Sequence, residues 1–301
     1  MPYLWSHILF GREALSEAGF SEPKHWRPFE LGCQGPDVLL YHNFWPWKRN
    51  DAVKRLGFAI HRNHCGPFLV DLIQAVGEHP GMRSYVAGFL THHVLDRNTH
   101  PYIHYWAGYR RYKHQKLEVI IDTLLAERME GIQTWKTPAF TRIDVGESLP
   151  RQWVEVLAGI AQQHFPQETE MVLPTHWNQA YQDMKRALRL FHDPLGIKWL
   201  LTFGKIGPFR YRPIRTDTDY LNESGREWSH PAIPGEKHRE SFLDLWATAL
   251  DEAALLLQQA DSYWKGTLPL STLEQTIGNI SYDTGKACDA NLTNHLAEPL
   301  V

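Results

Sequence analysis

The sequence predicts an all-α fold, built as a single multi-helix domain, and two observations support this prediction. Apolar residues recur at helical spacing along most of the chain, whereas alternating runs rich in β-branched residues, which mark strands, are nearly absent. The 301 residues are 43% hydrophobic and include 12 Trp, enough for a large packed core. Because no internal repeat or low-complexity linker interrupts the sequence, we predict one domain over residues 1–301.

The individual helices are predicted from their apolar stripes and their end signals. Leu9, Ala14 and Ala18 recur at helical spacing before Gly19, a residue typical of a helix C-terminus. Later helices are predicted at residues 67–76, 85–97, 112–130, 150–164, 177–191, 239–263 and 271–278. Pro101 is expected to end a helix just after His100, because proline lacks an N–H and clashes with the preceding turn.

Two segments lack a helical pattern. Residues 34–50 contain Gly35, Pro36 and Pro46 and are expected to form an ordered aromatic loop. Residues 204–237 hold four Pro, and we interpret them as a long excursion from the domain. A loop of that length inside a compact domain is usually functional, often as a lid or a binding surface.

Composition limits the location and the partners of the protein. A formal net charge of −3 gives no reason to expect bulk nucleic-acid binding. The three cysteines, Cys33, Cys65 and Cys288, form no CxxC pair, which favours a reducing compartment over a disulfide framework. The first residues lack a basic region and make a poor secretory signal, and no apolar run approaches the roughly 18 residues of a membrane span. We therefore expect a cytoplasmic protein without a transmembrane segment, for which transient contact with a membrane surface stays open.

The spacing of histidines and carboxylates points to a metal site. His92 and Asp96 are four residues apart and share one helix face, and His114 and Glu118 repeat this spacing on the next predicted helix. A single pair of this kind is more often exposed or capping. Two pairs with His100 between them resemble the way in which helix bundles assemble metal sites. His93 is expected to point about 100° away from His92 and to serve packing.

The chemistry of these groups favours zinc. Nitrogen and oxygen ligands without thiolate suit catalytic zinc, whereas carboxylates alone would suggest Mg²⁺ or Ca²⁺. Several ligands in one pocket imply two or three ions, and paired metals are a known device for the hydrolysis of phosphate esters.

In these motifs the chain resembles the bacterial zinc-dependent phospholipase C family, which is related in fold to the single-strand-specific zinc nucleases. The matching stretches are Ser6–Gly11, Leu31–Asp37, Leu56–His61, His92-xxx-Asp96-xxx-His100-Pro101 and His114-xxx-Glu118, followed less specifically by Trp228-x-x-Pro231, Ser241–Leu243 and Ser281–Gly285. The resemblance implies an all-α domain with three zinc ions and hydrolysis of phosphate esters by a zinc-activated water.

The resemblance also implies a ligand set. In that scheme the ligands of the first zinc are Asp37, His61, His92 and Asp96, those of the second are His100, His114 and Glu118, and those of the third are His7 and a bridging Asp96. Asp37 is the implied catalytic residue, which orients or deprotonates the water. His61 is preferred to His64 because it fits the family spacing. The family completes the third site with a terminal Trp; here Pro2, exposed if Met1 is removed, could substitute.

Several alternatives stay open from the sequence. Val38 stands where the family has a Tyr that helps to bind the lipid head group, so the substrate is a small-molecule or lipid phosphodiester of unspecified head group. The same cluster could serve a nuclease or nucleotidase, with Phe44, Trp45 and Trp47 as stacking rings. A non-catalytic zinc protein is the third interpretation. The excursion contains three arginines, Arg210, Arg212 and Arg215. They could donate hydrogen bonds to a phosphate if the excursion folds over the site. Solvated charge on a loop is the role expected about twice as often.

Overall fold

The computed structural model describes residues 4–20, 23, 25–48 and 52–301. These residues form thirteen α-helices, three 3₁₀ helices and one two-stranded sheet, which confirms the predicted all-α fold. The α-helices are α1 (Leu4–Glu17), α2 (Trp26–Gly32), α3 (Asp37–Leu40), α4 (Ala52–Arg62), α5 (Cys65–Ala75), α6 (Pro80–Ala107), α7 (Lys113–Glu130), α8 (Arg151–His164), α9 (Pro166–Thr169), α10 (Pro174–Phe191), α11 (Ile197–Leu201), α12 (Phe242–Trp264) and α13 (Leu270–Ile277). The short elements are η1 (Ala139–Thr141), η2 (Gly207–Phe209), η3 (Cys288–Ala290), β1 (Trp228–Ser229) and β2 (Lys237–His238), and the two strands pair antiparallel.

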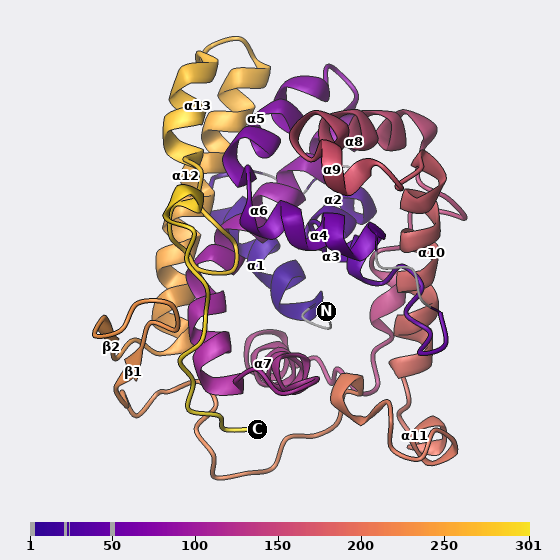
Figure 1. The fold of residues 1–301 in the computed structure, drawn as a ribbon, viewed down its shortest axis with the longest axis vertical. Coiled ribbons are helices and arrows are strands. Elements are labelled where there is room, and N and C mark those ends of the chain that lie inside the picture. The colour runs from indigo at the N-terminus through magenta and orange to yellow at the C-terminus, as the bar shows by residue number, and fades with distance from the viewer. Residues whose placement is uncertain (1–3, 21–22, 24, 49–51) are drawn as a thin grey trace.

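The long helix α6 is the centre of the packing. It contacts α1, α2, α7 and α12, and α8, α9 and α10 stand together on the side of the molecule opposite α12 and α13 (Figure 1). Most buried apolar side chains of the described residues belong to one cluster that runs from Leu4 to Ile277. The interpretation of residues 1–301 as one domain stays a prediction.

The expectation that Pro101 ends its helix is wrong, since α6 continues to Ala107. Both sides of the proline are buried, with Tyr102 and Ile103 fully covered in the turn that follows. Burial of such side chains stabilises the helix by about 1.5–3 kcal/mol each, which offsets the roughly 3 kcal/mol cost of an internal proline. The continuation places His104 on the same helix as His100.

Two glycines allow α2 and α6 to approach each other closely. A Cβ atom on Gly88 would collide with the backbone oxygen of Phe29, and one on Gly32 would collide with that of Tyr85. The close approach brings the backbone carbonyl of Cys33, just after α2, to the ring of His92 on α6.

The two segments without helical pattern behave differently. The predicted loop at residues 34–50 contains the short helix α3, which begins directly after Pro36, a residue pre-set for the start of a helix. The excursion at residues 204–237 is largely irregular, with only η2, β1 and the first residue of β2, and it passes below α7 in the view of Figure 1.

After α13 the chain runs back along α6 without a long helix (Figure 1). The backbone N–H of Tyr282 donates to the carbonyl of His61 at 2.9 Å, and that of Leu300 donates to the carbonyl of Trp106 at 2.7 Å. The residues that follow α13 therefore cover α6 along the face that holds its histidines. Among the residues that the structure describes, no helix combines the length and apolar character needed to cross a bilayer.

Candidate metal centre

All eight residues that the sequence singled out as ligands meet in one place. They fall into three neighbouring groups, and within each group the possible ligand atoms lie within 4.8 Å of one another. The groups are His7, His92 and Asp96; Asp37, His61 and His92; and His100, His114 and Glu118. Five helices contribute, namely α1, α3, α4, α6 and α7, so the fold brings together side chains that lie more than one hundred residues apart in the sequence.

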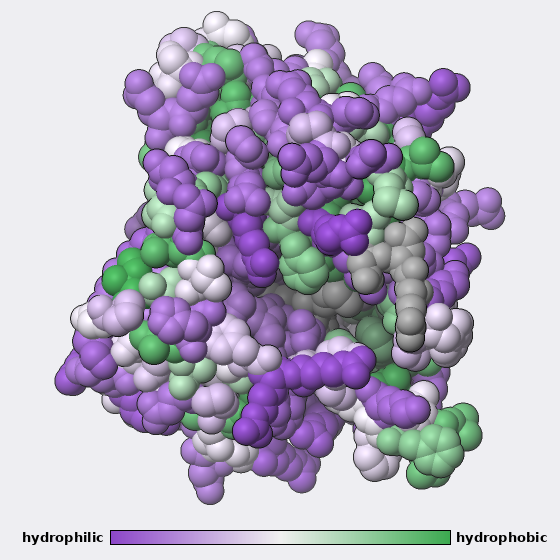
Figure 2. Space-filling model, in the orientation of Figure 1, coloured by the Kyte–Doolittle hydropathy of each residue, from purple (hydrophilic) through white to green (hydrophobic). Residues whose placement is uncertain are grey.

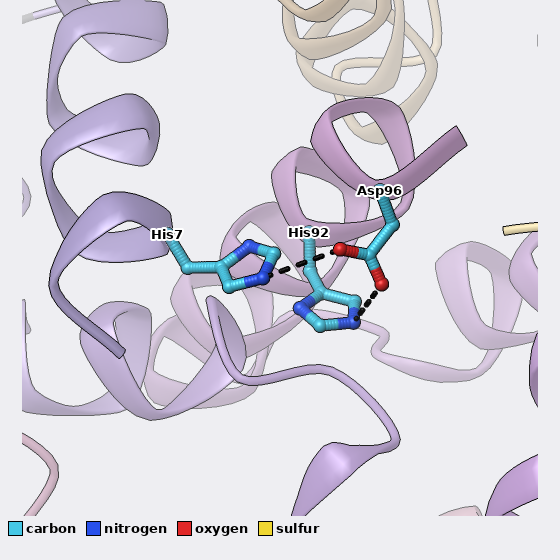
Figure 3. A group of neighbouring side chains, drawn as sticks. All are labelled: His7, His92 and Asp96. Carbon is cyan, nitrogen blue, oxygen red and sulfur yellow. Dashed lines mark ion pairs between the residues drawn. The ribbon is translucent and has the colours of Figure 1, made fainter. Parts of the chain in front are cut away.

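The carboxylate of Asp96 is the centre of this arrangement. The Nε2 atoms of His92 and His7 lie 3.0 and 3.3 Å from its two oxygens, as Figure 3 shows, and those of His100 and His61 lie at 3.4 and 3.9 Å. The carboxylate is 1% exposed. A carboxylate that faces four imidazoles through both oxygens has the position expected of a bridging ligand.

Three of these imidazoles are oriented by the backbone. The Nδ1 atoms of His61, His92 and His100 lie 2.6, 3.0 and 3.1 Å from the backbone oxygens of Gly57, Cys33 and Tyr282, respectively. A carbonyl oxygen can only accept, so each Nδ1 carries a proton, and this hydrogen bond turns the Nε2 atom of each ring toward the carboxylates. This second hydrogen bond is the usual way in which a protein orients a histidine that binds a metal.

These residues fit a zinc cluster. Within the described chain, both oxygens of Asp96 and Nε2 of His92 are buried without a hydrogen bond. Leaving such groups without a partner costs about 1–3 kcal/mol each. A cation bound by the imidazole nitrogens and the Asp96 carboxylate would remove this cost. Imidazole nitrogen and carboxylate oxygen together form a donor set that suits zinc.

The charges inside the centre support each other. Burial would lower the pKa of His61, but its contact with Asp37 at 3.2 Å and the charge of Asp96 outweigh burial and raise that pKa to about 9. Burial would likewise raise the pKa of Glu118, but the charge of His114, 2.9 Å away, lowers it to about 2. The carboxylates are therefore ionised at neutral pH, as metal ligands must be.

The structure adds detail to the implied ligand scheme. His92 stands in two of the three groups, between the site of His7 and that of Asp37. His61, not His64, enters the centre; His64 is exposed and has a left-handed backbone with φ of 50°. Pro2, the suggested substitute for a terminal Trp, lies outside the described residues.

His93 has a packing role. Its buried ring lies 4.4 Å from that of Tyr282, and its Nε2 lies 3.1 Å from the backbone oxygen of Ile280. Burial lowers the pKa of His93 to about 3, so the ring is neutral and donates from Nε2. It thereby attaches residues 280–282 to α6.

Sequence reasoning missed two residues beside the centre. His104 and Asp283 form a fourth group with His100, and Nε2 of His104 lies 3.7 Å from Asp283. Both line a cavity of about 310 Å³ whose wall also includes Arg62, and Arg62 donates to Asp283 at 2.5 Å. The i, i+4 spacing of His100 and His104 was the available signal, hidden by the expectation that Pro101 ends the helix.

Asp122, one turn beyond Glu118, belongs to none of the ligand groups and instead binds the first turn of α1. It accepts hydrogen bonds from the backbone N–H groups of Trp5 and Ser6 at 3.0 and 2.8 Å and from the hydroxyl of Tyr211 at 2.5 Å. These are first-turn donors of the helix that carries His7, so a distant carboxylate caps α1.

The remaining candidates lie elsewhere in the structure. Arg210 pairs with Asp193 at 3.4 Å, while Arg212 and Arg215 line a separate surface cavity. The rings of Trp45 and Trp47 stack on each other at 5.0 Å, and Trp47 is 71% exposed. The thiols are all free; the sulfurs of Cys65 and Cys288 lie 3.6 Å apart, and the thiol of Cys33 contacts Thr91.

The fold and the centre together define a helical protein with buried groups of His, Asp and Glu that could hold metal ions. A comparison with protein families agrees with this description, because the model of the zinc dependent phospholipase C family matches residues 6–163. The chain therefore belongs to the zinc dependent phospholipase C family, and the matched region carries all eight residues. No curated protein and no solved structure matches the chain.

Proposed function

We propose that the protein is a phosphodiesterase that hydrolyses phosphate diesters, as a phospholipase C does, at a cluster of two or three zinc ions held by the eight residues. The observation that carries the proposal is the meeting of three neighbouring ligand groups at Asp96, whose carboxylate lies within 4 Å of an imidazole from each of them. A single ion uses about four ligands, so eight exceed what one ion requires. Zinc in such a cluster supplies a nucleophile by lowering the pKa of water toward 7, and it offsets charge on the phosphoryl oxygens.

The chain itself sets where a substrate enters. Of the ligand side chains in the ion pairs of the centre, His114 and Asp37 are the most exposed, at 21% and 16%, whereas Asp96 and His92 are covered. A diester therefore approaches from the side of His114 and Asp37. We assign to Asp37 the orientation of the attacking water, since contact with His61 lowers the pKa of Asp37 against the effect of burial and keeps it ionised.

The test combines metal analysis with a substrate panel. Zinc-replete protein should contain two or three zinc ions per chain and should hydrolyse a soluble diester such as bis(p-nitrophenyl) phosphate faster than the corresponding monoester. One ion or fewer, or no turnover of any diester, would overturn the proposal. A closed, purely structural cluster would give full zinc content without turnover.

A matched pair of variants tests the ligand assignment. His61→Asn should lose zinc and diester hydrolysis, while His64→Asn should retain both, because His64 is exposed and its left-handed backbone suits Asn. Equal losses in the two variants would contradict the assignment.

The exposed ring of Trp47 favours a nucleotide substrate as the second candidate, because a base can stack on it. An oligonucleotide included in the panel decides between the two. Hydrolysis of the oligonucleotide that falls in Trp47→Ala, with bis(p-nitrophenyl) phosphate turnover unchanged, would favour the nuclease.

A further inference from the structure

A group of apolar side chains projects from the surface around α11. Four residues of this stretch rank among the most exposed large apolar side chains of the described chain: Phe203 at 91%, Leu195 at 81%, Leu201 at 72% and Leu200 at 69%. Ile197 and Trp199 are also about half exposed. We call residues 195–203 the apolar projection. Figure 2 shows it as a hydrophobic knob at the lower right corner of the molecule, where Figure 1 places α11.

The apolar projection has no inward-facing apolar side. None of the five residues of α11 is buried. Successive residues of a helix point about 100° apart, so exposed side chains at 197, 199, 200 and 201 surround the helix axis. A helix whose outward side chains are all apolar is normally embedded in a protein core or in lipid, and this one lies outside the core.

The polar groups of this region face inward and hold the apolar projection in place. Asp193 accepts hydrogen bonds from the backbone N–H groups of Lys198 and Trp199 at 3.1 and 2.9 Å. The Nζ of Lys198 donates to the backbone oxygens of Arg189 and His192, and Nε of Arg210 donates to that of Asp193. These hydrogen bonds hold the segment in a position in which its leucine and phenylalanine side chains face the solvent. In an ordinary surface turn the polar side chains face the solvent instead.

The segment that carries the apolar projection is rich in basic residues. Residues 189–215 contain six Lys or Arg and a single Asp, whereas the whole chain has a net charge of −3. Lys205, Arg212 and Arg215 are exposed in this stretch. Basic side chains beside exposed apolar ones complement a surface that is anionic outside and apolar beneath.

We propose that the apolar projection inserts into an anionic lipid surface, where its basic neighbours meet the phosphate head groups. A fluid lipid phase can cover all sides of α11 at once, whereas a protein partner would need a socket that encloses it. The choice of lipid rests in part on the proposed function, since a diesterase of phospholipid type must meet its substrate at a membrane. Insertion from one edge holds the protein on the surface without a membrane-spanning helix.

Vesicle binding tests this proposal without any turnover. Zinc-replete protein is sedimented with vesicles of phosphatidylcholine alone and with vesicles that also contain phosphatidylserine, at low and high salt. We expect clear partition onto the mixed vesicles, weaker partition onto the neutral ones, and a loss at high salt. The variant Leu200→Ser/Leu201→Ser/Phe203→Ser should reduce partition by about tenfold or more, since each apolar side chain that is withdrawn from lipid weakens binding.

The control variant is Met171→Ser/Leu173→Ser, which removes two exposed apolar side chains, 68% and 59% exposed, between α9 and α10. It should bind vesicles like the wild type. Equal binding by the wild type and the α11 variant would overturn the proposal, as would an equal loss in both variants. Self-association of the wild type that the α11 variant abolishes, without vesicle binding, would replace lipid by a second copy of the chain.

The readouts separate this inference from the proposed function. The α11 variant should keep its melting temperature and its turnover of soluble diester, because the mutated side chains are outside the core and away from the eight ligands. Vesicle binding without any diesterase activity would refute the proposed function and support the proposed insertion into lipid. Diesterase activity without vesicle binding would do the opposite.

Discussion

The substitution Asp96→Asn should destabilise the zinc-loaded protein much more than the zinc-free protein. With zinc, the carboxylate is the ligand that faces four imidazoles within 4 Å, and the amide is a poor substitute. Without zinc, the carboxylate is a buried charge whose two oxygens accept no hydrogen bond from the described residues. Its nearest neighbour is Nε2 of His92 at 3.0 Å, in a ring whose Nδ1 donates to the backbone oxygen of Cys33.

The size of the effect follows from these contacts. Loss of one buried charged ligand typically costs about 3–5 kcal/mol, so we expect at least about 3 kcal/mol in the loaded protein. In the zinc-free protein the amide removes an unsatisfied charge, and we expect a difference within about 1 kcal/mol. At about 2.1 cal/mol/K per residue, unfolding of 301 residues changes by about 0.6 kcal/mol per degree, so 3 kcal/mol corresponds to about 5 °C.

The assay is urea unfolding of both proteins at pH 7.5, each loaded with zinc and each after dialysis against a chelator, with metal analysis of every sample. Loaded Asp96→Asn should also contain fewer zinc ions than the wild type. If the substitution lowers the free energy of unfolding equally with and without zinc, Asp96 acts as an ion-pair partner of the histidines and the reasoning fails.

Three further substitutions test the surroundings of the centre. His93→Gln should keep full zinc content and cost about 1–2 kcal/mol of unfolding free energy from lost ring packing, as urea titration would show; zinc loss would mean that the wrong member of the His92-His93 pair was chosen. Burial raises the pKa of Asp122 to about 7, from an ordinary value near 3.8. Between these two pH values the folded protein keeps the proton of Asp122 while the unfolded chain has released it. The contribution of Asp122 to stability therefore falls as the pH rises from about 4 to 7. Zinc-free Asp122→Asn should lack that slope, and parallel pH profiles of the two proteins would contradict this. Gly285→Ala should destabilise by about 1–3 kcal/mol, because its φ is 63° and a Cβ would collide with the backbone oxygen of Arg97. The control is Gly266→Ala, because Gly266 has a φ of 73° but no atom of the described residues within 4 Å of an added Cβ. Gly266→Ala should lower the free energy of unfolding by less than Gly285→Ala when the two variants are compared by thermal unfolding.

The helical character of the ligand-bearing segments was predictable because ligands and core residues follow the same spacing. His92, Asp96 and His100 repeat every four residues, and the apolar residues between them repeat at the period of a helix. The meeting of α6 with His114 and Glu118 on α7 followed from the repeated pattern. The inclusion of His7 and Asp37 depended on family resemblance, since no spacing relates them to α6.

The support of the centre was not predictable in the same way. The groups that orient the imidazoles are backbone carbonyls, and every residue has one, so the sequence does not mark that of Cys33 or of Tyr282. Asp283 lies far along the chain from His104 and shares no period with it. The end of α6 was misplaced because local proline sterics were weighed without the tertiary burial of Tyr102.

The apolar projection shows a different limit. In the sequence, Trp199, Leu200 and Leu201 have the composition of a core segment, and hydropathy alone assigns such residues to the interior. Their exposure depends on where α11 lies relative to the core, which is a property of the tertiary fold.

The position of Tyr282 has a consequence for the biosynthesis of the protein. Its N–H binds the carbonyl of His61 and its carbonyl binds His100, so a residue translated late holds two ligands that were translated early. A nascent chain in which residue 282 is still inside the ribosome has its ligands but lacks one of the anchors of His100. The centre therefore has its full support only when the returning segment closes over α6, because a chain that ends before this residue lacks the carbonyl that accepts from Nδ1 of His100.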